Sequence, residues 1–165
     1  MHDVARLFQD HHRALCRYLF RFTGDADAAA DAAQEAFSRA LERPPNPAGA
    51  RAWLYTVATN AARQAGRTER RRARLLEHAP GRAPMGDPEP GPLDRLEAEE
   101  RRALVHDALL TLNPKERTAL LMREEGFTQR EIAAAVGATP QGVGSLIARA
   151  LTKLTDRLRL DEEDP

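Results

Sequence analysis

Residues 129–146 read QREIAAAVGATPQGVGSL, and this stretch decides the fold of the C-terminal half of the chain. Apolar residues recur at helical spacing on both sides of a short turn. Two helices that cross in a helix-turn-helix need a small residue where they touch and a glycine in the turn, which Ala133 and Gly137 supply. The apolar contacts between the helices are expected from Ile132, Val136, Val143 and Leu146. The pattern predicts a helix-turn-helix, with an ordinary helical hairpin as the alternative.

The second helix of this motif, expected over about residues 140–155, carries three candidate base-reading side chains. Gln141, Ser145 and Arg149 follow one another at intervals of four residues, which places them on one face. Glutamine can pair with adenine, arginine with guanine, and serine with bases or phosphates. In a helix-turn-helix this helix lies in the major groove, so we expect these residues to read base edges.

The remaining C-terminal helices are indicated by their caps. Asn113-Pro114-Lys115-Glu116 combines a cap, a proline at the first helical position and a reciprocal glutamate. Thr128 and Glu131 repeat the arrangement without proline, and Thr139 precedes Pro140. Together with a helix over about 94–111, these signals predict a four-helix domain over residues 94–165, which ends in an acidic tail.

A stretch rich in proline and glycine separates this domain from the first part of the chain. Residues 80–92 hold five Pro and three Gly, a composition that can neither continue a helix nor bury a core. We therefore predict a flexible linker over 80–93 and an N-terminal domain over 1–79. Seven of the eight aromatic residues precede the linker and only Phe127 follows it, which indicates two separate cores.

The N-terminal domain is predicted to be a bundle of three helices, over about 3–22, 26–42 and 49–74. Asp25 is placed to cap the second of them. Val and Ile together number only seven in 165 residues, while Leu and Ala are abundant, so strands would lack the residues they prefer. The fold class is therefore all-α, with two small helical domains.

Several classes of protein are excluded by what the sequence lacks. No apolar run approaches the roughly 18 residues of a membrane span, so no membrane insertion is expected. The N-terminus has no secretory signal pattern, which favours a cytoplasmic location. The single cysteine, Cys16, excludes a disulfide framework, and its pairing with His12 offers only two ligands, so no metal and no cofactor is expected. No phosphate-binding loop, catalytic triad or carboxylate pair is recognisable, which argues against an enzyme.

Three motifs in a fixed order carry a resemblance to a known family. They are Asp31-Ala32-Ala33-Gln34-Glu35-Ala36-Phe37, the segment RAWLYTVATNAAR over residues 51–63, and Leu112-Asn113-Pro114-Lys115-Glu116-Arg117 followed by GFTQREIA over residues 126–133. Over nearly the whole chain this resembles the extracytoplasmic-function (ECF) sigma factors, the smallest members of the bacterial sigma-70 family. The resemblance implies an alternative sigma factor that binds core RNA polymerase, recognises −35 and −10 promoter elements and promotes promoter melting.

The resemblance also implies partners and the residues that meet them. Asp31, Gln34 and Glu35 share one helical face and correspond to a patch that docks on the β′ clamp helices. Without the resemblance, the face formed by these three residues would be interpreted as a solvated helix face. Phe37, one turn further along, is expected in the core. The C-terminal domain is expected to meet the β flap and −35 DNA, and an anti-sigma factor is an expected further partner.

Contact with −10 DNA is implied for the third helix. The residues expected to make it are Asn60, Arg63, Gln64, Arg67, Arg70 and Arg71. Six Arg against one acid over residues 63–74 suit a phosphate backbone, although an isolated basic run is as often a solvated face. The preceding loop, residues 43–50, would capture a flipped base. Trp53 and Tyr55 are candidates for stacking on bases, but the spacing favours Trp53 as core.

The sequence departs from the family at the recognition helix. Basic residues are common in the family where this chain has Gly144 and Leu146, which predicts weaker −35 binding or an unusual −35 sequence. Gly142 and Gly144 each lower helix propensity by about 1 kcal/mol relative to Ala, and close approach of the backbone to DNA is one rationale for them. Two other readings remain, a stand-alone helix-turn-helix regulator and a helical adaptor that binds no DNA.

Overall fold

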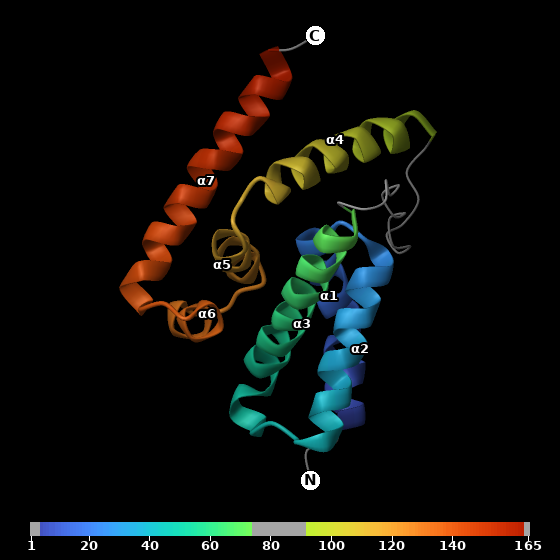
Figure 1. Ribbon diagram of the computed structural model, residues 1–165, viewed down its shortest axis with the longest axis vertical. Coiled ribbons are helices and arrows are strands. Elements are labelled where there is room, and N and C mark those ends of the chain that lie inside the picture. The colour runs from blue at the N-terminus through green and yellow to red at the C-terminus, as the bar shows by residue number, and fades with distance from the viewer. Residues whose placement is uncertain (1–3, 74–91, 164–165) are drawn as a thin grey trace. The chain divides into compact units, whose positions relative to one another are not determined.

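The computed structural model describes residues 4–73 and 92–163, and no strand occurs among them (Figure 1). The chain divides into two compact units, Met1–Pro84 and Met85–Pro165. The all-α fold class expected from the scarcity of β-branched residues is confirmed. None of the helices in the described part is long and apolar enough to cross a membrane. Arg74 and residues 80–91 of the predicted linker lie outside the described residues.

The N-terminal unit consists of α1 (Val4–Thr23), α2 (Ala26–Glu42), the 3-10 turn η1 (Pro47–Gly49) and α3 (Ala50–Ala73). The three long helices pack against one another in pairs. Alanines line the buried face of α2, and such small side chains allow neighbouring helices to approach closely. The largest of the fully buried side chains of this unit come from α1 and α3: Leu15, Tyr18, Leu19, Leu54 and Tyr55.

Local hydrogen bonds explain where these helices begin. The carboxylate of Asp25 accepts from the backbone N–H of Asp27 at 2.8 Å and of Ala28 at 3.2 Å, which confirms it as the cap of α2. In the loop that follows α2, the side chain of Asn46 accepts from the N–H of Ala48 at 3.1 Å and starts η1. The loop before α3 therefore has hydrogen bonding of its own.

The C-terminal unit consists of α4 (Pro92–Leu110), α5 (Pro114–Glu124), α6 (Gln129–Val136) and α7 (Pro140–Glu163). Helix α7 packs against each of the other three. Two boundaries differ from expectation. Helix α4 begins two residues early because the fixed φ of Pro92 suits the first helical position, so residues 92 and 93 are not linker. Helix α7 continues to Glu163 because no Gly or Pro follows Gly144 within it and because Leu154 and Leu158 are half-buried.

Both predicted capping boxes of this unit are confirmed. Asn113 Oδ1 accepts from the N–H of Glu116 at 2.8 Å, while Glu116 Oε2 accepts from the N–H of Asn113 at 3.3 Å. At the start of α6, Thr128 Oγ1 accepts from the N–H of Glu131 at 3.2 Å, and Glu131 Oε1 accepts from the N–H of Thr128 at 3.0 Å. At the start of α7, Thr139 Oγ1 accepts from the N–H of Gly142 at 3.1 Å. Side-chain acceptors therefore fix the N-termini of α5, α6 and α7.

Candidate nucleic-acid interface

The turn between α6 and α7 depends on the backbone of one residue. Gly137 has φ 68° and ψ 38°, the left-handed region in which a helix commonly ends on glycine. A Cβ built on Gly137 would meet nothing within 4 Å, so the site demands glycine for its backbone conformation and not for lack of space. The left-handed residue ends α6, and Thr139 caps α7 two residues later.

The apolar residues that the sequence pattern singled out in α6 and α7 are buried where these helices pack. Ile132 and Val143 are fully buried, and Ala133, Val136 and Leu146 are at most 8% exposed. The burial of Leu146 gives a physical reason for the departure from the basic residue common in the family at this position. A side chain that packs inside the unit is not available to a DNA phosphate, so Leu146 belongs to the core.

The opposite face of α7 is open. Gln141, Ser145 and Arg149 are all exposed, so the structure brings the three predicted base-reading residues onto one free face. The two glycines of this helix differ in their surroundings. A Cβ on Gly142 would lie 3.1 Å from Thr139 Oγ1, whereas a Cβ on Gly144 would meet nothing within 4 Å. Steric crowding within the unit therefore does not explain why position 144 is a glycine.

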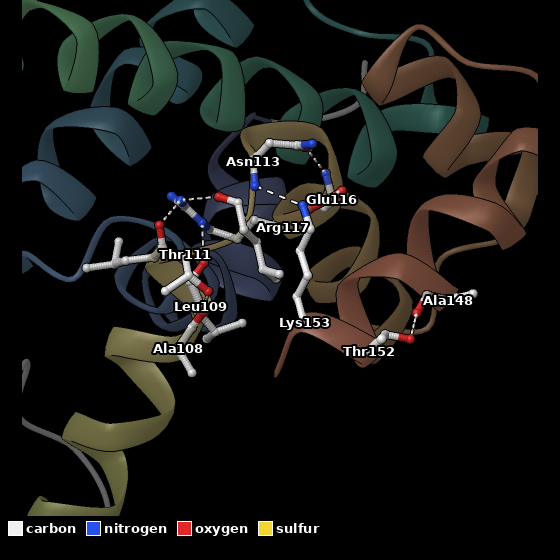
Figure 2. A network of polar contacts seen from close by, with 11 residues as sticks. Ala108, Leu109, Thr111, Asn113, Glu116, Arg117, Ala148, Thr152 and Lys153 are labelled. Carbon is white, nitrogen blue, oxygen red and sulfur yellow. Dashed lines mark hydrogen bonds and ion pairs between the residues drawn. The ribbon is translucent and has the colours of Figure 1, made fainter. Parts of the chain in front are cut away.

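A buried carboxylate of α5 bonds to a basic side chain of α7 (Figure 2). Lys153 Nζ donates to Glu116 Oε2 at 2.9 Å and to Oε1 at 3.0 Å, and the glutamate side chain is 3% exposed. Burial opposes the charged form of Glu116. The hydrogen bonds from Lys153 and the Asn113 N–H, with the charges of Lys153 and Arg149, outweigh that cost and hold the pKa of Glu116 below its ordinary value. Local sequence patterns missed this pair because its members are 37 residues apart.

A second buried charge, Arg117, ties α5 to the end of α4 (Figure 2). Its Nε donates to the carbonyl of Leu109 at 3.0 Å, and its Nη2 donates to the carbonyls of Leu110 and Leu112 at 3.3 and 2.9 Å. The last carbonyls of a helix have no partner within the helix. Arg117, which is 4% exposed, supplies partners for the end of α4 and thereby fixes α5 against it.

In the N-terminal unit, α2 presents the predicted polar patch. Asp31, Gln34 and Glu35 are exposed on one face, while Ala32, Ala33 and Ala36 on the other face are buried. The carboxylate of Glu35 also pairs with Arg39 across 2.8 Å, an ion pair that the sequence analysis did not foresee. Phe37 is 6% exposed and belongs to the core, as expected.

Helix α3 holds the residues expected at −10 DNA. Asn60, Gln64 and Arg67 are exposed and Arg63 is half-buried. Arg70 and Arg71 lie in the last turns of α3, and their side chains fall outside the described part of the chain.

The two aromatic candidates of α3 differ in burial from what their spacing predicts. Tyr55 is fully buried, with its ring 4.9 Å from that of Tyr18 and the Arg51 guanidinium 5.3 Å from its centre, so the prediction that it stacks on bases is wrong. Trp53 is only partly buried, so its placement in the core is wrong in part. Helical spacing locates the centre of a buried face well but resolves its edges poorly, because residues near an edge differ little in angle from exposed neighbours.

The His12 and Cys16 pair forms part of an aromatic contact. His12 Nε2 lies 3.6 Å from Cys16 Sγ, and the Phe8 ring stacks on His12 with centroids 4.2 Å apart. Burial raises the pKa of the Cys16 thiol, which disfavours the thiolate that binds metals. Within residues 4–73 and 92–163, no group of three or more metal-ligating side chains gathers.

Comparison with known proteins accounts for both units. Residues 7–72 match sigma-70 region 2, and residues 102–154 match sigma-70 region 4. The ECF RNA polymerase sigma factor SigL of Mycobacterium tuberculosis is 35% identical, over 96% of this chain and 89% of its own length. The chain belongs to the ECF sigma factors of the sigma-70 family. The RNA polymerase sigma-E factor of Streptomyces avermitilis is 34% identical over 98% of this chain and 87% of its own. This ECF sigma factor binds core RNA polymerase and promoter DNA and directs promoter recognition and transcription initiation.

Solved structures show the same fold. The sigma factor RpoE of Bartonella quintana, in complex with the anti-sigma factor NepR, superposes with a TM-score of 0.71 at 21% identity, over 98% of this chain and 99% of that one. CnrH, in complex with the cytosolic domain of CnrY, superposes with a TM-score of 0.70 at 23% identity, over 96% and 88% of the two chains.

Proposed function

We propose that this ECF sigma factor divides promoter recognition among three helices: α2 docks on polymerase, α3 meets −10 DNA and α7 reads the −35 element. The observation that carries the proposal is the two-sided character of α7. Gln141, Ser145 and Arg149 are free on one side, while Val143, Leu146 and Ala150 are buried on the other. A capped helix with an exposed row of hydrogen-bonding side chains suits insertion into a major groove.

Docking on polymerase is assigned to Asp31, Gln34 and Glu35 against the β′ clamp helices, with the C-terminal unit on the β flap. The Glu35–Arg39 pair is half exposed on both sides, and such surface pairs contribute about 1 kcal/mol or less. Exchanging Arg39 for a basic side chain of the polymerase therefore costs little. Complementary charge of this kind favours encounter and correct orientation.

The binding of melted −10 DNA is assigned to α3 and the loop before it. Asn60, Arg63, Gln64 and Arg67 provide polar and basic groups along the helix, and Arg70 and Arg71 continue the basic run. The loop over residues 43–50 is proposed to hold a flipped base, and the exposed part of Trp53 is proposed to stack on bases. Basic grooves with stacking groups are the usual way to hold single strands.

Further properties follow from this assignment. The polymerase performs the chemistry, so this chain is proposed to have no catalytic activity, and it acts where polymerase and chromosome are, in the cytoplasm. The solved complex of the similar sigma factor RpoE with the anti-sigma factor NepR supports the proposal that an anti-sigma factor also restrains this chain.

The proposal is tested by run-off transcription with purified core polymerase on a pool of genomic promoter fragments. Wild type is compared with Asp31→Ala/Glu35→Ala. The control Gln9→Ala/Asp10→Ala removes two exposed polar side chains from α1 instead. The docking role is supported if discrete transcripts require the protein, become weaker with the α2 variant and persist with the control variant. Undiminished transcripts from the α2 variant would contradict it, and a duplex footprint without any transcript would favour a stand-alone regulator.

A further inference from the structure

Helix α7 carries two exposed basic side chains one turn apart, Arg149 and Lys153, of which Lys153 bonds to Glu116. Arg149 belongs to the proposed −35 reading face, and Lys153, whose side chain is 49% exposed, donates to both oxygens of Glu116 at 2.9 and 3.0 Å (Figure 2). Residues four apart on a helix lie on the same side. The contact with Glu116 is therefore made one turn beyond the last residue that is proposed to touch a base.

The carboxylate that receives Lys153 is itself held firmly. Glu116 Oε2 accepts from the backbone N–H of Asn113, and the N–H of Glu116 donates to Asn113 Oδ1, so the residue is locked into the first turn of α5. Its side chain is 3% exposed. Because both the backbone and the side chain of Glu116 take part in this capping box, Glu116 offers Lys153 a defined partner at the start of α5.

The reading face of α7 is thus held by two kinds of contact. Along the length of this face Val143 and Leu146 are buried on the other side of the helix, and one turn beyond Arg149 the side chain of Lys153 is bonded to α5. The helix needs such support because Gly142 and Gly144 weaken its first turns. Bidentate readout of a base edge depends on the position of the side chain, so a small rotation of α7 about its axis would misplace Arg149.

From this geometry we infer that Glu116 is a positioning residue for −35 recognition, which acts by binding Lys153 and fixing the rotation of α7 beneath Gln141, Ser145 and Arg149. The inference rests on the proposed function of α7. It assigns no DNA contact to Glu116 or to Lys153.

A different role for Lys153 makes the opposite prediction. If Lys153 contacted a phosphate, Glu116→Gln would release it and tighten binding to every duplex, whatever its sequence. If Glu116 positions the helix, the same substitution lowers the preference for the correct −35 sequence and leaves binding to a scrambled sequence unchanged.

The test measures equilibrium binding of the holoenzyme to two promoter duplexes, one with the −35 element found by run-off transcription and one with that element scrambled. The full-length variants are Lys153→Met, Lys153→Arg, Glu116→Gln and the double variant Glu116→Gln/Lys153→Met. Lys115→Met is the matched control, because it removes an exposed lysine from the same turn of α5. Circular dichroism establishes at which temperature all variants are folded.

We expect Lys153→Met and Glu116→Gln each to lower the preference for the correct duplex at least about fivefold, the lower end of what one bidentate base contact provides. The double variant should lower the preference for the correct duplex by no more than either single variant does. Lys153→Arg and Lys115→Met should keep this preference. The inference would be overturned if Lys153→Met and Glu116→Gln lost affinity equally for both duplexes, or if these two single variants kept the preference for the correct duplex. Either result would leave the proposed function standing. A wild type without any −35 preference would overturn the proposed function and the inference with it.

Discussion

Arg117 is a buried cation whose partners are backbone carbonyls, which makes it a sensitive point in the C-terminal unit. Its guanidinium binds the carbonyls of Leu109, Leu110 and Leu112 where α4 ends, and the Leu109 carbonyl also accepts from the backbone N–H of Leu112 at 3.1 Å. Arg117→Met keeps much of the volume and removes every donor. Buried groups that lose their partner cost about 1–3 kcal/mol each, and partial rearrangement reduces their sum.

We therefore expect Arg117→Met to lower the free energy of unfolding of the C-terminal unit by about 3 kcal/mol. Urea unfolding followed by circular dichroism measures this change. Arg102→Met, an exposed arginine of α4, is the control and should change the free energy by less than about 0.5 kcal/mol. An Arg117 variant as stable as the control would show that water replaces the guanidinium at no cost.

The lowered pKa of Glu116 predicts a pH dependence of a definite sign. As the pH falls below the ordinary value of 4.5, the unfolded chain binds a proton at Glu116 before the folded chain does. The stabilisation is therefore complete above about 4.5 and is lost as the pH falls through the lower, folded-state pKa. Between pH 5 and 3 the stability of the C-terminal unit should fall more steeply in the wild type than in Glu116→Gln, as measured by urea unfolding at each pH. Parallel curves would contradict an ion pair in the folded state.

At the scale of residues, sequence patterns predict what is local. The Asn113–Glu116 capping box spans four residues, so it could be identified from spacing alone. The bond between Lys153 and Glu116 joins α7 to α5 and needs the tertiary structure. The neighbouring residues Trp53 and Tyr55 show a second limit. Both are aromatic in one helix, and which of them is buried depends on how α3 is rotated against α1.

At the scale of elements, the two glycines Gly137 and Gly144 should respond to alanine in opposite ways. Gly137 has φ 68°, where a Cβ costs about 1–2 kcal/mol, so Gly137→Ala should destabilise the C-terminal unit by about that amount. Gly144 lies inside a helix with open space around it, so Gly144→Ala should stabilise the unit by up to about 1 kcal/mol. Thermal unfolding of the two variants compares them directly.

Gly144→Ala also tests why a glycine occupies the reading face. If the backbone of α7 approaches DNA closely at this position, the variant should be more stable yet bind the −35 duplex several-fold more weakly, as measured with the holoenzyme. Binding that is undiminished in the stabilised variant would count against close approach.

Helix starts could be predicted from the sequence more accurately than helix ends. A start needs a cap of a definite chemical type, and Asp25, Asn113, Thr128 and Thr139 each make the bond that their position predicted. The end of α7 has no such signal. It was expected near residue 155 but continues to Glu163, because no helix breaker occurs there and leucines continue to pack.

At the scale of the whole molecule, two cores on one chain suit a protein whose two DNA elements lie apart. Each unit alone offers a modest surface, and the overall charge of zero gives no general attraction to DNA. Once both units are bound to one polymerase, each raises the effective concentration of the other at its promoter element.

Separate cores predict separate unfolding, and the chain carries a convenient probe for it. Its single tryptophan, Trp53, lies in the N-terminal unit, so its fluorescence follows that unit, while circular dichroism follows both. Leu54→Ala removes a fully buried leucine of the N-terminal core and should lower the urea midpoint of the fluorescence change, at a cost of about 2–5 kcal/mol. Ile132→Ala, in the other core, should leave that midpoint in place and shift only the remaining part of the dichroism change. A single transition that both substitutions move equally would show that the two units unfold together.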